Sequence, residues 1–166
     1  MRMNGNIFRY IDEYLTKIEK TFVGIGILTI TIFVFSGIIT RYFLNFSPSW
    51  IEESAIYINL WIVFVGAGLC IKKEEHVNVD IIFRMLSKRG REILTGMLCF
   101  LSAIFIGFFG YYSFMLVIHV KETQQVSTAI DWLPMHIVYC SAVIGSILMI
   151  IEFFKMGISY LYKKYK

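Results

Sequence analysis

The chain has little of what small soluble proteins use to hold themselves together. It contains two prolines and three cysteines, and the cysteines (Cys70, Cys99 and Cys140) lie far apart with no Cys-x-x-Cys pair. Disulfide frameworks and thiolate metal sites need clustered partners, so we expect no metal site and interpret all three as small buried apolar residues. Charged residues make up 17% of the chain and hydrophobic residues 57%. That much apolar surface cannot be hidden in a globule of 166 residues, so the main solvent is lipid.

Four apolar stretches are long enough to cross a bilayer, because each has about 20 or more mostly apolar residues. In lipid they must be helical, since no water is present to satisfy an open backbone. We therefore predict an all-α membrane protein in which residues 1–166 form a single integral membrane domain with four transmembrane helices. The predicted spans are 22–44, 50–71, 94–118 and 132–154.

Lysine and arginine are distributed unevenly between the connecting segments. The segment before the first span, the connection between spans 2 and 3, and the tail after span 4 are rich in both residues, whereas the other two connections hold only Lys121. Because positively charged segments stay in the cytoplasm, we predict that both termini and the middle connection are cytoplasmic.

Two of these cytoplasmic segments, residues 6–20 and 78–91, have apolar residues at helical spacing. In the second, Arg84, Lys88 and Arg91 share the face opposite the apolar stripe. Such helices lie in the plane of the membrane with the basic side toward anionic lipid headgroups. We predict in-plane amphipathic helices here, with the three basic residues as headgroup contacts; an ordinary solvated linker is the alternative.

The middle of every span lacks ionisable residues. A chain that moves an ion or an acid through its own helices needs such groups near the bilayer midplane. The midplane of span 2 holds Asn59, for which we favour an interhelical hydrogen bond over substrate binding. We therefore predict that the chain is neither a transporter by itself, nor a small multidrug exporter, nor an enzyme.

His119 and His136 are the best candidates for haem or metal ligands. They lie on either side of the centre of the outer connection between spans 3 and 4, so their depths can match. A haem between these helices would make the chain a membrane anchor of a respiratory complex, which is the alternative function. Histidines near a membrane interface are more often hydrogen-bonded surface groups.

Two adjacent glutamates open span 2, in the stretch SPSWIEESAIY (47–57). Their side chains point about 100° apart on a helix, which is poor geometry for an acid/base pair. Ser49 and Glu52 fit a capping box, in which the glutamate reaches back to a free backbone N–H. Arg41 and Glu53 are equally distant from the centre of the short turn before span 2. We predict an Arg41–Glu53 ion pair across the hairpin, with Glu52 as the alternative partner.

Aromatic residues follow one side of span 2, where Trp50, Tyr57, Trp61 and Phe64 fall together. Trp50 suits an interfacial belt, but Trp61 lies too deep for that and should face the bundle core or a partner protein. Small residues predict close helix contacts. They are Gly66 and Gly68 in span 2, Ala103 and Gly107 in span 3, and Ser141 and Gly145 in span 4.

Residues 41–86 resemble the small membrane subunit of tripartite ATP-independent periplasmic (TRAP) transporters, the DctQ-type family. The matching residues, in order, are Arg41, Trp50, Glu52, Glu53, Tyr57, Trp61, Gly66, His76, Val79 and Asp80. Glu75 departs from the pattern, which has glycine before the histidine. Outside this stretch the likeness rests on the number and length of the spans.

The resemblance implies a non-enzymatic scaffold subunit of a secondary-active transporter in the bacterial inner membrane. Its partners would be a larger multi-span membrane subunit, which binds substrate and sodium ions and moves as an elevator, and a periplasmic binding protein that delivers an organic acid such as a dicarboxylate or a sialic acid. It implies no cofactor in this subunit and no nucleic acid partner. His76 and Asp80 would form a structural polar cluster or a helix cap. We expect the large subunit to contact the side that bears Trp61 and Phe64.

Overall fold

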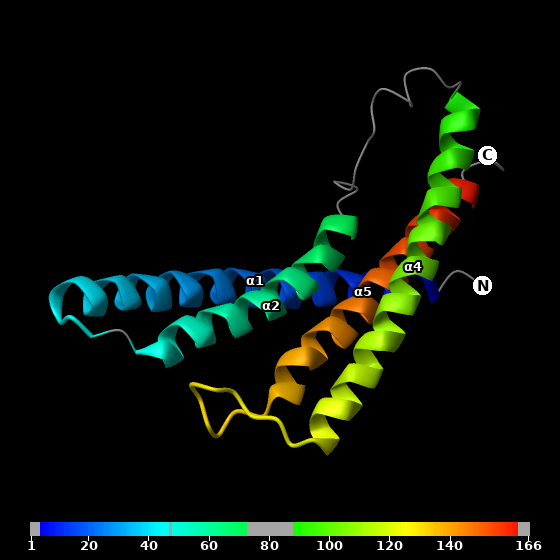
Figure 1. The fold of residues 1–166 in the computed structure, drawn as a ribbon. Helices are drawn as coiled ribbons and strands as arrows, with labels where there is room; N and C mark the ends of the chain where they lie inside the picture. The colour runs from blue at the N-terminus through cyan, green and yellow to red at the C-terminus, as the bar shows by residue number, and fades with distance from the viewer. Residues whose placement is uncertain (1–3, 47, 73–87, 163–166) are drawn as a thin grey trace.

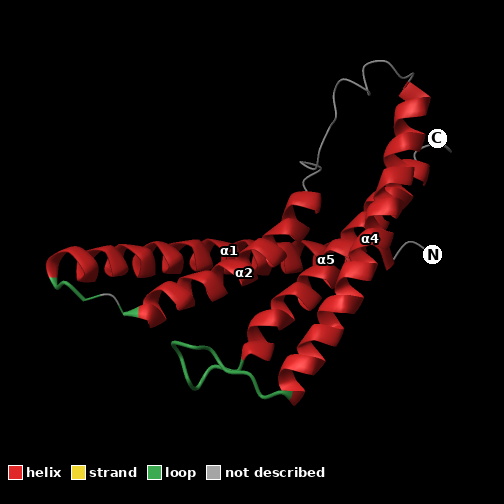
Figure 2. Ribbon diagram, viewed as in Figure 1, coloured by secondary structure: helices red, strands yellow, loops and turns green. Residues whose placement is uncertain are grey.

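The computed structural model describes residues 4–46, 48–72 and 88–162, which form four long helices and no strand (Figures 1 and 2). They are α1 (Asn4–Phe43), α2 (Ser49–Lys72), α4 (Lys88–Glu122) and α5 (Met135–Tyr162). All four are long and apolar enough to cross a membrane. The predicted all-α fold with four spans is confirmed. The cytoplasmic position of the termini stays a prediction, because it depends on the charge distribution alone.

The first helix is longer than its predicted span. Residues 6–20 continue without a break into the transmembrane part of α1, so they do not form a separate in-plane helix (Figure 1). No proline interrupts the backbone hydrogen bonds near residue 21, and an established helix propagates readily. The predicted helix 78–91 lies mostly outside the described residues, and its last positions, 88–91, belong to α4.

The helices pack as an open row in the order α1, α2, α5, α4. Most contacts between the described helices join α1 to α2, α2 to α5 and α5 to α4. In the most apolar window of α1 no residue is buried. An open row is compatible with lipid, because apolar side chains at its edges need no cover from water.

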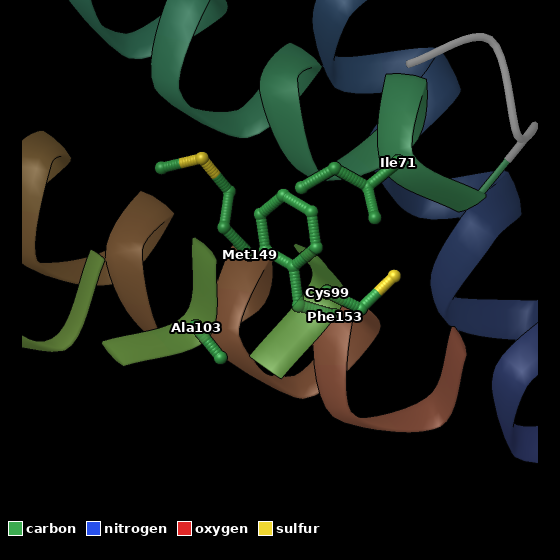
Figure 3. Close-up of a cluster of buried hydrophobic side chains, with 5 residues drawn as sticks. All are labelled: Ile71, Cys99, Ala103, Met149 and Phe153. Carbon is green, nitrogen blue, oxygen red and sulfur yellow. The ribbon is translucent and has the colours of Figure 1, made fainter. Parts of the chain in front are cut away.

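A small apolar core lies where α2, α4 and α5 meet (Figure 3). Ile71 of α2 is fully buried there, and around it gather Cys99, Ala103, Met149 and Phe153. The prediction of buried cysteines is confirmed for Cys99 only, because Cys70 is exposed and Cys140 is partly buried.

Two of the predicted glycine contacts bring helices close together. A Cβ on Gly145 would lie 2.5 Å from the Cβ of Phe64, and a Cβ on Gly68 would lie 3.4 Å from the Cβ of Leu148. Both contacts join α2 to α5. The expectation for Gly107 is wrong, since a Cβ there would meet nothing within 4 Å.

Candidate functional site

Two polar clusters lie at opposite ends of the helix row. The outer end carries loop 44–48 between α1 and α2 and loop 123–134 between α4 and α5. At the first loop, Asn45 adopts a left-handed conformation (φ 49°), which asparagine tolerates better than most residues. The N–H groups of Leu44 and Phe46 both donate to the carbonyl of Thr40, which closes the end of α1.

Arg41 forms an ion pair with Glu52, and both side chains are 57% exposed. The predicted Arg41–Glu53 pair is therefore wrong, and the alternative partner is the one found. Glu53 points elsewhere, because adjacent side chains on a helix diverge by about 100°. α2 begins at Ser49, as the capping box requires, and the bond from Glu52 back to the helix start stays a prediction.

Glu53 is bound by the loop between α4 and α5. The hydroxyls of Ser127 and Thr128 donate to its two carboxylate oxygens, and the N–H of Ala129 donates to Oε2 at 3.1 Å. Ser127 is almost fully buried, and its Oγ also accepts from the N–H of Ile130. Charge-assisted hydrogen bonds are about twice as strong as neutral ones. Glu53 therefore holds loop 123–134 against the N-terminal part of α2.

Loop 123–134 has an ordered backbone of its own. The N–H of Ser127 donates to the carbonyl of Leu133 at 3.0 Å, and Val126 forms an isolated antiparallel bridge with Pro134. The loop therefore presents its hydroxyls to Glu53 from a folded turn. This contact could not be read from the sequence, because Ser127 is 74 positions from Glu53 and no periodic pattern links them.

A cavity of about 650 Å³ opens beside this contact, between α1, α2 and loop 123–134. Its lining includes the aromatic residues Phe33, Trp50, Tyr57 and Trp132, and its one charged residue is Asp131. The lining residues include no lysine, arginine or histidine. The lining thus offers a carboxylate neutral donors from Ser54, Tyr57 and two tryptophans but no cation, and Asp131 adds a like charge.

The inner ion-pair cluster lies at the other end of the row and joins α1, α2 and α5. It consists of Asp12, Glu19, Lys72, Glu152 and Lys155. The Nζ of Lys72 lies 3.1 Å from Glu19, 3.6 Å from Glu152 and 3.8 Å from Asp12. The side chains of Lys72, Glu19 and Glu152 are only 10–11% exposed. Removing one member of such a buried network leaves the others uncompensated.

Lys155 extends the cluster toward its exposed side. Its Nζ lies 2.6 Å from Asp12 and 2.9 Å from Glu152, and its side chain is 50% exposed. The Asp12–Lys155 contact holds the start of α1 beside the end of α5. The sequence does not predict this cluster, because its amphipathic pattern places Asp12 and Glu19 in a separate in-plane helix.

The aromatic side chains predicted to share a partner surface have different neighbours. The ring of Trp61 lies edge-on to Phe22 of α1, with centroids 6.4 Å apart. Phe64 stacks on Phe109 of α4 at 5.9 Å and lies against Gly145 of α5. Trp50 meets Phe33 edge-on near the outer end. Trp61 and Phe64 are therefore packing residues between helices rather than one joint surface.

Among the described residues, the histidines and the segments predicted to be cytoplasmic add no further cluster. His119 is exposed in the last turn of α4, and His136 is partly buried in the first turn of α5. Within the described ranges, no group of three or more His, Cys, Asp or Glu residues could hold a metal ion. The two-histidine haem site stays a prediction. His76, Asp80 and Arg84 lie outside the described residues, as do the side chains of Lys88 and Arg91.

Residues 30–159 match the profile of the family described as tripartite ATP-independent periplasmic transporters, DctQ component. The chain is 24% identical over 135 residues to the C4-dicarboxylate TRAP transporter small permease protein DctQ of Vibrio cholerae. This alignment covers 80% of the chain but only 57% of the Vibrio protein.

Two other relatives are covered over more of their length. The ectoine TRAP transporter small permease protein TeaB of Halomonas elongata is 24% identical over 156 residues, or 94% of this chain and 77% of TeaB. A putative TRAP transporter small permease protein of Haemophilus influenzae is 30% identical over 146 residues, or 86% of this chain and 87% of its own length.

Proposed function

Because this chain belongs to the DctQ component family of tripartite ATP-independent periplasmic transporters, we propose that it is the stationary scaffold of such a transporter. It is a multi-pass protein of the inner membrane. Its relatives are permease subunits and not enzymes, so the non-enzymatic prediction is confirmed. The scaffold holds a larger membrane subunit, which carries the substrate and sodium sites, while a periplasmic binding protein delivers the substrate.

One observation carries the scaffold role: the charged side chains of the described spans lie near their ends and join helices. Glu53 fastens loop 123–134 to α2 at one end, and Lys72 joins α1, α2 and α5 at the other. A subunit that conducts its own substrate would need ionisable groups near the midplane. Contacts at both ends instead favour a body that keeps its shape while a partner moves.

We propose that the substrate is an organic acid of the dicarboxylate or sialic acid type, selected by the other two components. The outer cavity supports substrate selection by the other two components, because its lining residues offer no cation for a carboxylate. The relatives support it too, since the chain is equally similar, at 24%, to a C4-dicarboxylate and an ectoine subunit.

Reconstitution with purified components tests the scaffold role. The chain is co-expressed with its cognate large membrane subunit, and uptake of labelled acid into liposomes is measured with the binding protein and a sodium gradient. Uptake is expected only with all three components, and none with this chain alone. Unchanged uptake without the chain, or substrate transport by the chain alone, would overturn the proposal.

The same purified protein tests the haem alternative. A colourless preparation without a Soret band argues against a haem between His119 and His136. A Soret band that is lost when both residues are changed to Ala would favour the respiratory anchor instead.

A further inference from the structure

One face of α2 is exposed in the part of the chain that the structure describes. Ile56 and Val63 are 57% and 54% exposed, and Asn59 and Cys70 are also exposed. These four residues recur at intervals of three, four and seven, so they form a single stripe along the helix. We call this stripe the α2 ridge. The opposite side of the helix is buried by its neighbours.

Asn59 is the polar member of the α2 ridge, and it lies near the bilayer midplane, where an unsatisfied polar group is most costly. It lies near the midpoint of α2 (Ser49–Lys72), about 15 Å from Ser49 and about 20 Å from Lys72 at a rise of 1.5 Å per residue. A bilayer core is about 30 Å thick, so the amide lies close to its centre. Among residues 4–46, 48–72 and 88–162, its side chain makes no hydrogen bond. The predicted bond to another helix of this chain is therefore not made within the described part.

Lipid tails cannot satisfy this amide, because they have neither donors nor acceptors. α5 provides the contrast, because its exposed stripe is apolar as far as Ile151: Ile137, Ile144, Ile147 and Ile151 are all more than 40% exposed. The polar member of the stripe, Lys155, lies near the inner end of the helix and is paired with Asp12 and Glu152. The α5 stripe therefore leaves no polar group unsatisfied in lipid, whereas the α2 ridge does.

We propose that the α2 ridge is the surface on which a transmembrane helix of the large membrane subunit packs, with a hydrogen-bonding side chain opposite Asn59. This inference rests on the proposed function and specifies the face that the partner contacts. A membrane-embedded protein can supply both the apolar cover for Ile56 and Val63 and the polar group for the amide. Gly66 is partly buried, and a Cβ there would lie 3.9 Å from the side chain of Val23 in α1, so this glycine faces α1 rather than the partner.

Photo-cross-linking of the co-expressed complex locates the contact. A benzophenone amino acid replaces Val63 on the α2 ridge or, as a matched control, Ile147 on the α5 stripe. The two native residues are 54% and 53% exposed. We expect an adduct with the large subunit from position 63 and none from position 147. An adduct from position 147 alone, a homodimer adduct from position 63, or lipid adducts alone from position 63 would each overturn the proposal.

Substitution of Asn59 tests the hydrogen bond itself. Asn59→Leu has nearly the same shape and removes a lipid-incompatible group, so the isolated chain should be as thermally stable as the wild type or more so. The affinity for the large subunit should fall about three-fold, as expected for one hydrogen bond within a membrane. Val63→Leu, one turn along the ridge, serves as the control. It should change the thermal stability and the affinity for the large subunit less than Asn59→Leu does. Equal affinity for Asn59→Leu and wild type would refute the bond.

The two proposals fail in different ways. If the chain does not co-purify with the large subunit at all, the scaffold function fails together with this inference. If it co-purifies and supports uptake, but position 63 gives no adduct with the large subunit, the scaffold function stands and the α2 ridge is the wrong face.

Discussion

Lys72 and Glu19 lie 3.1 Å apart where the inner ends of α2 and α1 meet, and both side chains are nearly buried. The same ammonium group also lies between Asp12 and Glu152. A single residue at the end of α2 therefore lies within 4 Å of three carboxylates, and Lys155 approaches two of them, Asp12 and Glu152, more closely.

Lys72→Met is expected to be severely destabilising, because it leaves the buried carboxylate of Glu19 without its cation, whereas Asp12 and Glu152 keep Lys155. The expected loss is about 3–5 kcal/mol of unfolding free energy, visible as a lower thermal midpoint in detergent. Lys155→Met is the matched control, since its side chain is 50% exposed and a half-exposed pair contributes about 1 kcal/mol or less. Similar losses for the two variants would show that burial does not govern this cluster.

Glu53→Ala is expected to release loop 123–134 from α2. A hydrogen bond to a charged group contributes about 1.5–3 kcal/mol to stability. The variant removes the carboxylate that accepts hydrogen bonds from Ser127, Thr128 and Ala129. Faster amide hydrogen exchange at residues 127–130 measures the release. Glu52→Ala is the control, because its partner Arg41 lies in the last turn of α1 and not in loop 123–134. Exchange at residues 127–130 should stay at the wild-type rate.

Charge exchange at the hairpin separates the two glutamates. Arg41→Glu places like charges beside Glu52 and should lower the yield of folded protein modestly, since an exposed pair contributes about 1 kcal/mol or less. Arg41→Glu with Glu52→Arg should restore the yield, whereas Arg41→Glu with Glu53→Arg should lower it further. The opposite order of rescue would place Arg41 beside Glu53 after all.

Gly145→Ala is expected to force α5 away from α2, because its Cβ would lie 2.5 Å from the Cβ of Phe64 and 2.9 Å from the Phe64 carbonyl oxygen. Overpacking of this kind costs about 1–3 kcal/mol and should lower the thermal midpoint. Gly107→Ala meets open space and gains helix propensity, so it should be neutral or slightly stabilising. A neutral Gly145→Ala would mean that the α2–α5 contact is looser than its geometry indicates.

The helices of this chain could be predicted from sequence because lipid leaves the backbone no alternative. A run of apolar residues then determines a helix by length alone, and the four spans were found in this way. The end of the N-terminal amphipathic segment could not be found, since nothing in residues 18–24 signals whether a helix bends or continues. The ion pair between Asp12 of α1 and Lys155 of α5 lies within the extended part of α1, and the sequence does not predict this pair.

The polar contacts were predictable only where chain connectivity limits the choices. Arg41 could be paired across a short turn, and the remaining ambiguity lay between two adjacent glutamates. Glu53 and Lys72 instead find partners far away in sequence, on loop 123–134 and on α5. Such pairings depend on helix order in the row, which hydropathy does not encode.

The two polar clusters also mark a thickness. Along α1, Glu19 of the inner cluster and Arg41 at the outer end are about 33 Å apart at 1.5 Å per residue, and along α2 Glu52 and Lys72 are about 30 Å apart. These spacings match the hydrocarbon core of a bilayer, about 30 Å. The charged ends therefore set the depth and tilt of the chain by hydrophobic matching.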